Sequence, residues 1–352
     1  MTLRVLIVGS GIAGLALARA LARDGAAVEV VERDAVPRTA GAGIYLPGNA
    51  ARALRALGLE PQWREIPRQR FCDHRGRLLF EVDVARLWAG VGPCLAVHRA
   101  DVHALLLEAA GDVPVRRGLT VAGVAGQAVE LSDGSGGDYD LVVGADGVHS
   151  GVRALAFGAA AAAPLLVGQT GRRFLAPRPP EVTTWSVMLG RDATFLSMPL
   201  DDERAYCYWD GASAEGFAAP APALLAGAGE IHTAPIEEVA LDTWVRDRVV
   251  LIGDAAHATS PNMAQGAAMA LEDALVLAAA LRENSSVADA LGTFESARRP
   301  RTDCVRAQTH RRDRTRALPP AVRNGVLRLA GRRIFRANYR PLLAEPRMDS
   351  SS

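Results

Sequence analysis

Three glycines near the N-terminus have the spacing of a dinucleotide-binding turn. Gly9, Gly11 and Gly14 directly follow a short apolar run, Val5–Val8, and precede a segment whose apolar residues recur at helical spacing. In such a turn the first glycine permits the tight bend, the second admits a pyrophosphate, and the third lets helix and strand pack closely. The free N–H groups at the start of the helix favour the anion.

An acidic residue stands where this type of turn needs one. Glu32 follows the next predicted strand, Val28–Val31, and lies 18 residues after Gly14. At this position the carboxylate accepts hydrogen bonds from ribose hydroxyls. A glycine pattern alone would be weak, but strand, glycines, helix, strand and acid occur here in order. We therefore predict a Rossmann-type dinucleotide site in the first 33 residues.

Two later segments also place glycine beside aspartate after an apolar run. Gly144-Ala145-Asp146-Gly147 follows Leu141–Val143, and Gly253-Asp254 follows Val249–Ile252. Open α/β sheets bind ligands at the carboxyl ends of their strands, so we expect the three segments to share one site. After the third segment, a helix starting near Gln265-Gly266 would direct its free N–H groups toward negative charge that develops on a bound ligand. Pro261 would make the loop before this helix rigid.

The elements around these segments predict an α/β fold with a second domain of the α+β kind. We expect a Rossmann-type domain with a parallel sheet, a smaller substrate domain with a largely antiparallel sheet, and a C-terminal helical tail. Gly41–Asn49 reads as a loop with Asn49 as N-cap of the next helix, and Val121–Leu131 as one strand. The region 216–230 reads as a connector. The predicted divisions are 1–70, 97–160 and 241–295 for the first domain, 71–96 and 161–240 for the second, and 296–352 for the tail.

Five aromatic residues gather between Thr183 and Asp210, where two or three alternating strands are expected. Core packing is the favoured interpretation for each, and lining of a substrate pocket is the alternative. Strand register decides between them, because a shift of one residue moves every side chain to the other face. The residues are Trp185, Phe195, Tyr206, Tyr208 and Trp209.

Composition excludes several kinds of chemistry. All 40 basic residues are arginine, so lysine Schiff bases and P-loop lysines are ruled out. The four cysteines include no CxxC pair, which argues against a disulfide framework or a metal site. The longest uncharged apolar stretch, Leu155–Gly168, is shorter than the roughly 17 to 25 residues of a membrane span. We expect a soluble, cytoplasmic protein.

Arginine dominates the C-terminal tail. Between Ala297 and Arg340 there are 14 arginines and two acidic residues. The favoured interpretation is a helical tail whose arginines cover surface or dock against an acidic face. Steering of a phosphorylated cofactor is an alternative. Nucleic-acid binding is disfavoured because no recognition motif accompanies the charge.

Together, the three segments resemble the FAD-dependent aromatic hydroxylases, the class A flavoprotein monooxygenases typified by p-hydroxybenzoate hydroxylase. They occur in the family's order, as does Val97–His103, and the resemblance covers most of the chain. It implies that Glu32 binds the adenosine ribose, Arg99 contacts FAD, Asp146-Gly147 lies near the pyrophosphate, and Asp254 hydrogen-bonds the ribityl chain. The FAD-binding residues predicted are Gly9, Gly11, Ala13, Gly14, Glu32, Arg33, Gly43, Arg99, Asp146, Gly147, Gly253, Asp254, Gln265 and Gly266.

The resemblance also implies the activity. It indicates a monooxygenase that uses NAD(P)H and O2 to hydroxylate a small aromatic or heteroaromatic substrate through a flavin C4a-hydroperoxide. FAD is the expected cofactor, and NADPH or NADH a transient co-substrate. Alternatives are a flavin-dependent dehydrogenase or reductase and a non-catalytic FAD-binding protein; a halogenase is disfavoured because the chain has no lysine. We expect a monomer or homodimer without nucleic-acid or membrane partners.

Candidate catalytic residues are few. Tyr45 follows a loop that in the resembled family passes close to the isoalloxazine, and it is a candidate with Pro261 to contact the reacting groups. Core packing is the alternative for Tyr45. His149 and His257 are each expected to fix a loop by hydrogen bonding rather than transfer protons. Arg172, Arg173 and Arg191 are candidates for binding a substrate carboxylate. The family commonly has Gly at position 264 and Asn at position 268, where this chain has alanine.

Overall fold

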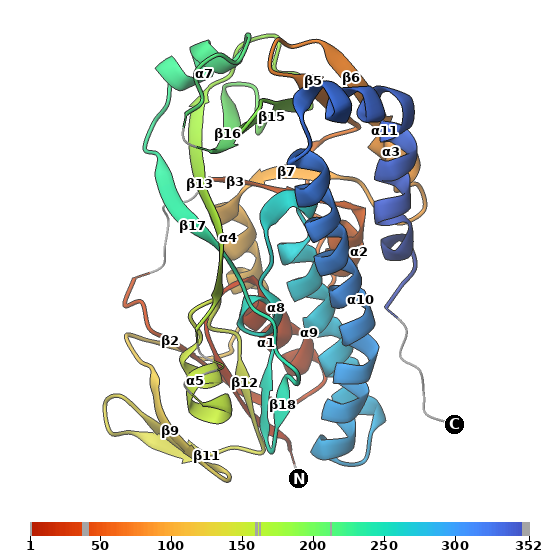
Figure 1. Cartoon of the computed structure of the whole chain (residues 1–352). Coiled ribbons are helices and arrows are strands. Elements are labelled where there is room, and N and C mark those ends of the chain that lie inside the picture. Colours follow the sequence, from red (N-terminus) through yellow and green to blue (C-terminus); the bar gives the residue numbers. More distant parts are fainter. Residues whose placement is uncertain (1, 37–41, 159–160, 162, 212, 347–352) are drawn as a thin grey trace.

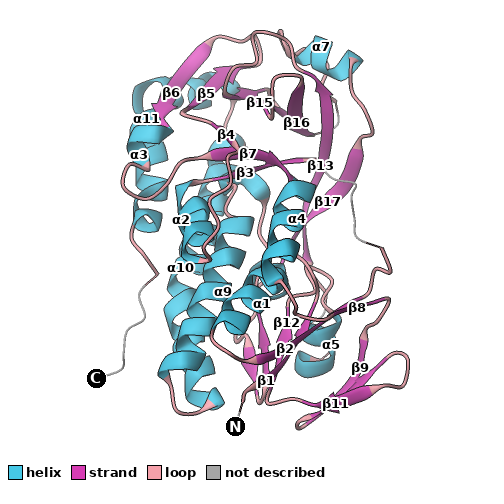
Figure 2. Ribbon diagram, turned by 180° about the vertical axis from the view of Figure 1, so that it is seen from behind, coloured by secondary structure: helices cyan, strands magenta, loops and turns pink. Residues whose placement is uncertain are grey.

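The computed structural model describes residues 2–36, 42–158, 161, 163–211 and 213–346. Two large sheets organise the chain, with long helices between and beside them. Figure 1 shows the six-stranded sheet at the lower end of the molecule and most of the seven-stranded sheet at the upper end. Figure 2 shows the same arrangement from behind.

The six-stranded sheet contains the strands that lead into the three predicted cofactor segments, which are Gly9–Gly14, Gly144–Gly147 and Gly253-Asp254. Its strands after the first are mutually parallel, and β18 is antiparallel to β19. The central strands are buried along almost their whole length, as expected for a parallel sheet covered by helices. In spatial order the strands are β18 (Val245–Arg246), β19 (Val249–Leu251), β12 (Leu141–Gly144), β1 (Arg4–Val8), β2 (Ala27–Glu32) and β8 (Val115–Arg117).

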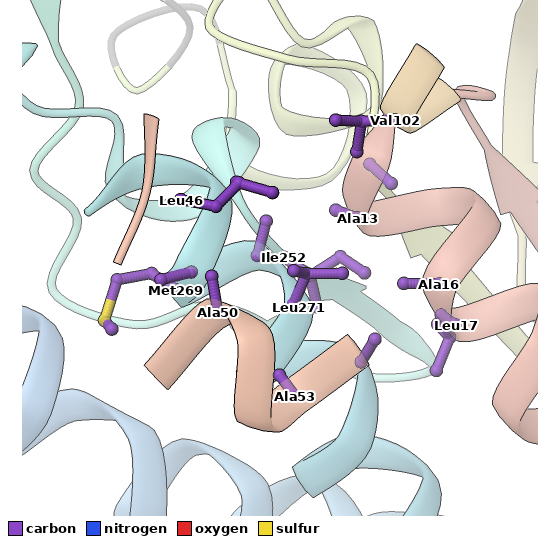
Figure 3. Close-up of a cluster of buried hydrophobic side chains, with 14 of the residues drawn as sticks. Ala13, Ala16, Leu17, Leu46, Ala50, Ala53, Val102, Ile252, Met269 and Leu271 are labelled. Carbon is purple, nitrogen blue, oxygen red and sulfur yellow. The ribbon is translucent and has the colours of Figure 1, made fainter. Parts of the chain in front are cut away.

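Alanine-rich helices pack beside this sheet. Figure 3 shows alanines of α1 (Ile12–Arg23) and α2 (Gly48–Ala56) beside Met269 and Leu271 of α9 (Gly266–Glu283). Small side chains let helix axes approach closely, so these helices form one core with the sheet. α4 (Arg99–Ala110) contributes Val102 to the same core, and α5 (Gly151–Phe157) follows β12.

The seven-stranded sheet is antiparallel except where β14 pairs in parallel with β5. Its two faces belong to different cores. Tyr206 and Tyr208 face the core shared with the first sheet, whereas Phe195 and Trp209 face a separate core with α7 (Ala221–Ala226). In spatial order the strands are β17 (His232–Glu238), β13 (Leu165–Pro177), β16 (Arg204–Asp210), β15 (Thr194–Pro199), β14 (Trp185–Leu189), β5 (Arg68–Asp73) and β6 (Leu78–Asp83).

Four local predictions are wrong. Pro47, not Asn49, is the N-cap of α2. The predicted loop around Tyr45 contains strand β3 (Gly43–Leu46), which pairs with β7 (Leu95–His98) and so joins the small sheet that also holds β4 (Arg64–Glu65).

The segment 121–131, predicted as one strand, is a hairpin of β9 (Val121–Ala125) and β10 (Ala128–Leu131), because Gly126 turns the chain with a positive φ. β11 (Gly136–Asp138) pairs with β10 and adds a third strand to this hairpin. The connector at 216–230 contains α7. Gly41 lies outside the described residues.

The C-terminal tail consists of two long helices, as predicted. α10 (Val287–Arg316) runs along α9, and α11 (Pro320–Leu343) packs against β6. The short elements α3 (Val84–Leu87), α8 (Asp254–His257) and the 3-10 turn η1 (Pro261–Met263) complete the structure. Among the described residues, no helix combines the length and apolar character that a membrane span requires.

Candidate cofactor and substrate site

The three predicted cofactor segments meet at the carboxyl ends of three adjacent strands, β1, β12 and β19. Gly9 has a φ of +107°, and a Cβ built on it would lie 2.4 Å from the carbonyl oxygen of Ala145. A Cβ on Gly253 would lie 3.0 Å from the Cβ of Ala13. Glycine is therefore required where the first segment touches each of the other two.

Gly11 and Gly14 serve different purposes. A Cβ on Gly14 would lie 2.0 Å from the carbonyl oxygen of Gly9, so this glycine permits close packing inside the turn. A Cβ on Gly11 would meet nothing within 4 Å. The turn thus leaves open space at Gly11, at the N-terminus of α1, where a pyrophosphate would bind. This geometry fits the dinucleotide that the sequence predicts.

Glu32 is held at the end of β2 as a hydrogen-bond acceptor. Its carboxylate accepts hydrogen bonds from the backbone N–H of Ser10 (2.8 Å), the Ser10 hydroxyl (3.0 Å) and the N–H of Asp34 (3.0 Å). Partial burial opposes ionisation, but these hydrogen bonds prevail and lower the pKa of Glu32. His103 of α4 contacts the Ser10 carbonyl at 2.9 Å, which fixes the same turn. The carboxylate therefore stays charged near neutral pH.

Asp146 has a structural role at the start of α5. Its carboxylate accepts hydrogen bonds from the N–H groups of Gly151 (2.7 Å) and Val152 (3.1 Å) and from the Ser150 hydroxyl. The neighbouring Gly147 has a positive φ, and a Cβ there would meet nothing within 4 Å. The Asp146 carboxylate is therefore used by α5, and the part of this segment that a ligand could contact is the backbone at Gly147.

Asp254 differs from Asp146 in that its carboxylate is exposed, and no hydrogen bond or ion pair to it is found in the described part of the chain. A Cβ on Gly266, at the start of α9, would lie 4.0 Å from its Oδ1. A free carboxylate beside an open helix start is suited to accept hydrogen bonds from the hydroxyls of a ribityl chain. Arg33 and Arg99 are also exposed.

The loop before α9 holds an alanine in a left-handed conformation where the family commonly has glycine. Ala264 has φ +49° and ψ +37°, a left-handed conformation that favours glycine, the residue common there in the family. Gln265 is buried and exchanges amide hydrogen bonds with Asn49 of α2 at 3.0 and 3.3 Å. Ala268 is fully buried. Pro261 begins η1 and is exposed, next to this loop.

A buried ionic cluster that the sequence analysis missed holds α9 in place. The fully buried guanidinium of Arg298 donates to Asp273 (2.7 Å) and Glu272 (2.8 Å), and Arg301 donates twice to Glu272 (2.6 and 2.7 Å). Asp273 also accepts the N–H of Gly253 at 2.8 Å. The signal in the sequence is the adjacent pair of acids inside an otherwise apolar helix.

The two histidines that follow the second and third segments each contact a carboxylate. His257 lies 2.6 Å from Asp273, with 11% of its side chain exposed. His149 lies 3.1 Å from Glu237 on the surface. Arg153, also missed as a site residue, is buried and donates to the carbonyl oxygens of Ala255 and Ala161, both at 2.9 Å. These contacts hold the second and third segments together.

Strand β16 of the seven-stranded sheet contacts β3 of the small sheet. A Cβ on Gly43 would lie 2.6 Å from the Cβ of Tyr206, so glycine allows the two strands to meet. Tyr45 is buried, its ring packs edge-on against Trp185 with centroids 4.6 Å apart, and burial raises its pKa well above the ordinary value. Within the described chain the buried indole N–H of Trp185 has no hydrogen-bond partner. The catalytic role predicted for Tyr45 stays a prediction.

The three candidate arginines of the second sheet are separated. Arg173 lies over the ring of Tyr208, 5.4 Å from its centroid, on the face toward the first sheet. Arg172 lies over Trp209 on the opposite face and donates to the carbonyl oxygen of Gly211 at 2.7 Å. Arg191 is exposed in a turn. Of the three, only Arg173 faces the side where the predicted cofactor segments lie.

Comparison with known proteins agrees with this geometry. The FAD binding domain family matches residues 2–162 and 218–309. The chain is 34% identical over 337 residues to 2-heptyl-3-hydroxy-4(1H)-quinolone synthase of Pseudomonas aeruginosa, covering 87% of each protein. It is 32% identical over 340 residues to aurachin C monooxygenase/isomerase of Stigmatella aurantiaca, covering 88% of each.

The fold is shared as well. The crystal structure of Klebsiella pneumoniae HpxO with FAD and uric acid superposes with a TM-score of 0.86 at 25% identity and covers 97% of both chains. Open space at Gly11, the free carboxylate of Asp254 and the ionised Glu32 are features that an FAD molecule requires. The chain therefore belongs to the family of FAD-dependent aromatic hydroxylases and is an FAD-dependent monooxygenase.

Proposed function

We propose that this monooxygenase uses NAD(P)H and O2 to hydroxylate a small, flat, nitrogen-containing aromatic substrate. The names of its relatives support this class, since one makes a 4-quinolone and a structural neighbour binds uric acid. Both molecules contain a planar heterocycle with nitrogen in the ring and oxygen substituents on it. The substrate would lie between the FAD site and the face of the seven-stranded sheet that bears Tyr206 and Tyr208.

The residues around the open turn would hold FAD. Glu32 would accept hydrogen bonds from the ribose, and Asp254 from the ribityl hydroxyls. The pyrophosphate would occupy the space at Gly11, against the N-terminus of α1. The start of α9 would direct its partial positive charge toward negative charge on the reduced ring. Bound FAD supplies the redox chemistry, taking hydride from NAD(P)H and delivering one oxygen atom of O2 to the substrate.

The proposed substrate class rests on the side chains that the seven-stranded sheet presents toward the FAD site. Burial raises the pKa values of the Tyr206 and Tyr208 phenols, so both remain neutral. The Tyr208 hydroxyl donates a long hydrogen bond of 3.4 Å to Asp210, which a substrate oxygen would replace. Arg173 adds a positive charge above the Tyr208 ring. Aromatic faces stack on a flat ring, while the guanidinium and phenols bind its oxygen substituents. Between the two sheets such a substrate would also be shielded from water.

Stopped-flow reduction of the flavin tests the proposal. The purified yellow protein is mixed anaerobically with NADPH or NADH, with and without 4-quinolones, uric acid, hydroxynicotinate or p-hydroxybenzoate. We expect one heterocycle to accelerate bleaching of the flavin and, in air, to yield a product heavier by one oxygen atom. Reduction at the same rate with every compound, or a product without added oxygen, would contradict the proposal and favour a dehydrogenase.

A further inference from the structure

The outer face of α11 carries an apolar stripe that nothing in the described chain covers. Val322, Val326 and Leu329 follow one another at helical spacing and are 53%, 38% and 90% exposed. Leu318 lies in the turn before the helix, and Leu78 of β6 is exposed as well. Half of the strongly exposed large apolar side chains of the described chain are therefore found in this one region.

The same helix is strongly basic and contains no acid. Between Arg314 and Ala344 the chain has eight arginines and neither aspartate nor glutamate. Five of these arginines are exposed on α11: Arg328, Arg332, Arg333, Arg336 and Arg340. Among the described residues only Arg328 pairs with an acid, Asp73, at 3.7 Å. Docking against an acidic face, which the sequence suggested, explains buried arginines such as Arg298 but not these.

A hollow of about 430 Å³ lies between α11 and β6 and joins the apolar and basic features. Its lining combines apolar side chains of β6 and α11 with four arginines of α11. The lining residues are Leu78, Leu79, Phe80, Arg328, Leu329, Arg332, Arg333 and Arg336. Anionic groups with an attached apolar chain match such a lining, because the charge binds the arginines while the chain contacts the apolar side chains.

We propose that the outer face of α11 binds the surface of a membrane that contains anionic lipid. In this arrangement Leu329 and its stripe enter the acyl boundary, and the arginines contact lipid phosphates, as in other basic amphipathic helices that lie on a bilayer. The helix stays folded on the protein and does not cross the bilayer. The proposal differs from the expectation of no membrane partner, and it does not depend on which substrate the enzyme hydroxylates.

Two other occupants fit the face less well. A second copy of this chain would bring together two faces that each carry exposed arginines and no acid, so no ion pair could form between the two α11 helices. A nucleic acid would satisfy the arginines, but it would leave Val322, Val326 and Leu329 against phosphate groups and water. Only a lipid surface offers both negative charge and apolar depth at the same interface.

Vesicle co-sedimentation of the FAD-loaded enzyme tests the inference. The probes are vesicles of phosphatidylcholine alone and of equal parts phosphatidylcholine and phosphatidylglycerol. We expect binding to the anionic vesicles that decreases as salt is added, since screening weakens exposed charge pairs. Equal binding to both vesicle types, no binding to either, or retention by duplex DNA in preference to anionic vesicles would overturn the proposal.

Matched variants locate the surface. The change Leu329→Ser and the double change Arg333→Gln with Arg336→Gln should each weaken vesicle partitioning by about tenfold or more. The control changes are Leu155→Ser on α5 and Arg282→Gln on α9, which alter an exposed leucine and an exposed arginine elsewhere. The flavin spectrum and melting temperature report that each variant is folded. Equal weakening by the controls would show that the effect does not belong to α11.

Discussion

At the residue scale, two glycines of the same turn are expected to respond differently to the same substitution. Gly14 is enclosed by backbone of the turn, while the space beside Gly11 is open. A methyl group at position 14 must therefore displace protein atoms, whereas one at position 11 occupies only the space that the pyrophosphate needs. Stability and cofactor binding can thus be separated within one turn.

The change Gly11→Ala should leave the melting temperature of the FAD-free protein nearly unchanged but weaken FAD binding by about tenfold or more. The change Gly14→Ala should lower the melting temperature of the FAD-free protein, because its Cβ would lie 2.0 Å from a carbonyl oxygen. Thermal melts and flavin titration measure the two effects. Similar losses of apoprotein stability in both variants would contradict the assignment.

The buried carboxylate of Asp273 predicts a pH dependence of stability. Although burial opposes ionisation, His257, Arg298 and the N–H of Gly253 lower the pKa of Asp273 in the folded protein. A lowered pKa gives stability that is complete above the unfolded value, about 3.9, and is lost as pH falls through the folded value. The difference in unfolding free energy between the wild type and Asp273→Asn should therefore shrink below about pH 4.

Urea unfolding followed by tryptophan fluorescence at a series of pH values measures this difference. The change Asp303→Asn serves as control, because Asp303 is exposed and, within the part of the chain that the structure describes, pairs with Arg306 alone. Its effect on stability should be small at every pH. A difference for Asp273→Asn that stays constant, or that grows as the solution is acidified, would contradict the predicted direction.

At the scale of elements, α9 is connected to α10 by charges inside the core. Arg298 of α10 is fully buried and bonds both Glu272 and Asp273 of α9. Asp273 in turn binds the N–H of Gly253, in the third cofactor segment. Displacing one helix relative to the other would therefore also displace Asp254 and the start of α9.

The change Arg298→Met should destabilise the protein by about 3 to 5 kcal/mol, because it removes a buried guanidinium from two buried carboxylates, whose closest remaining ionisable partners are Arg301 and His257. It should also weaken FAD binding through the displaced third segment. The matched control is Arg306→Met on the exposed side of α10, where a surface ion pair contributes about 1 kcal/mol or less. Chemical denaturation and flavin content check both effects. Equal destabilisation by the two changes would refute a special role for Arg298.

At the scale of the whole molecule, the two faces of the seven-stranded sheet pack against different parts of the protein. Tyr208 and Trp209 are neighbours in β16 but point to opposite faces, one toward the core shared with the first sheet and one toward the core with α7. Alternation along a strand makes this separation complete. Substitutions at adjacent positions should therefore change different properties of the enzyme.

The change Tyr208→Phe should raise the KM for the aromatic substrate and increase the share of NAD(P)H oxidised without product, while stability changes little. The change Trp209→Phe should lower stability by about 1 to 3 kcal/mol through lost packing and leave the substrate KM unchanged. Steady-state kinetics with product quantification and thermal melts separate these outcomes. An unchanged KM in Tyr208→Phe would remove this tyrosine from the substrate surface.

The sequence by itself determined the family, the cofactor and the arrangement of parallel and antiparallel sheets. These follow from local patterns: glycines at a strand end, an acid at the end of the next strand, and apolar runs bounded by turns. The resemblance required only that such patterns occur in order. The helical tail was likewise the favoured interpretation of the arginine-rich C-terminal segment.

Only the tertiary structure decided how individual side chains are used. Asn49 was expected to cap a helix but bonds Gln265, far along the chain, and Asp146 binds α5 instead of remaining free as Asp254 does. Alternation places Tyr208 and Trp209 on opposite faces, but which of the two points toward the first sheet depends on strand register, which one sequence does not specify. Partners of a buried polar group are chosen by three-dimensional proximity, and its sequence neighbours do not reveal them.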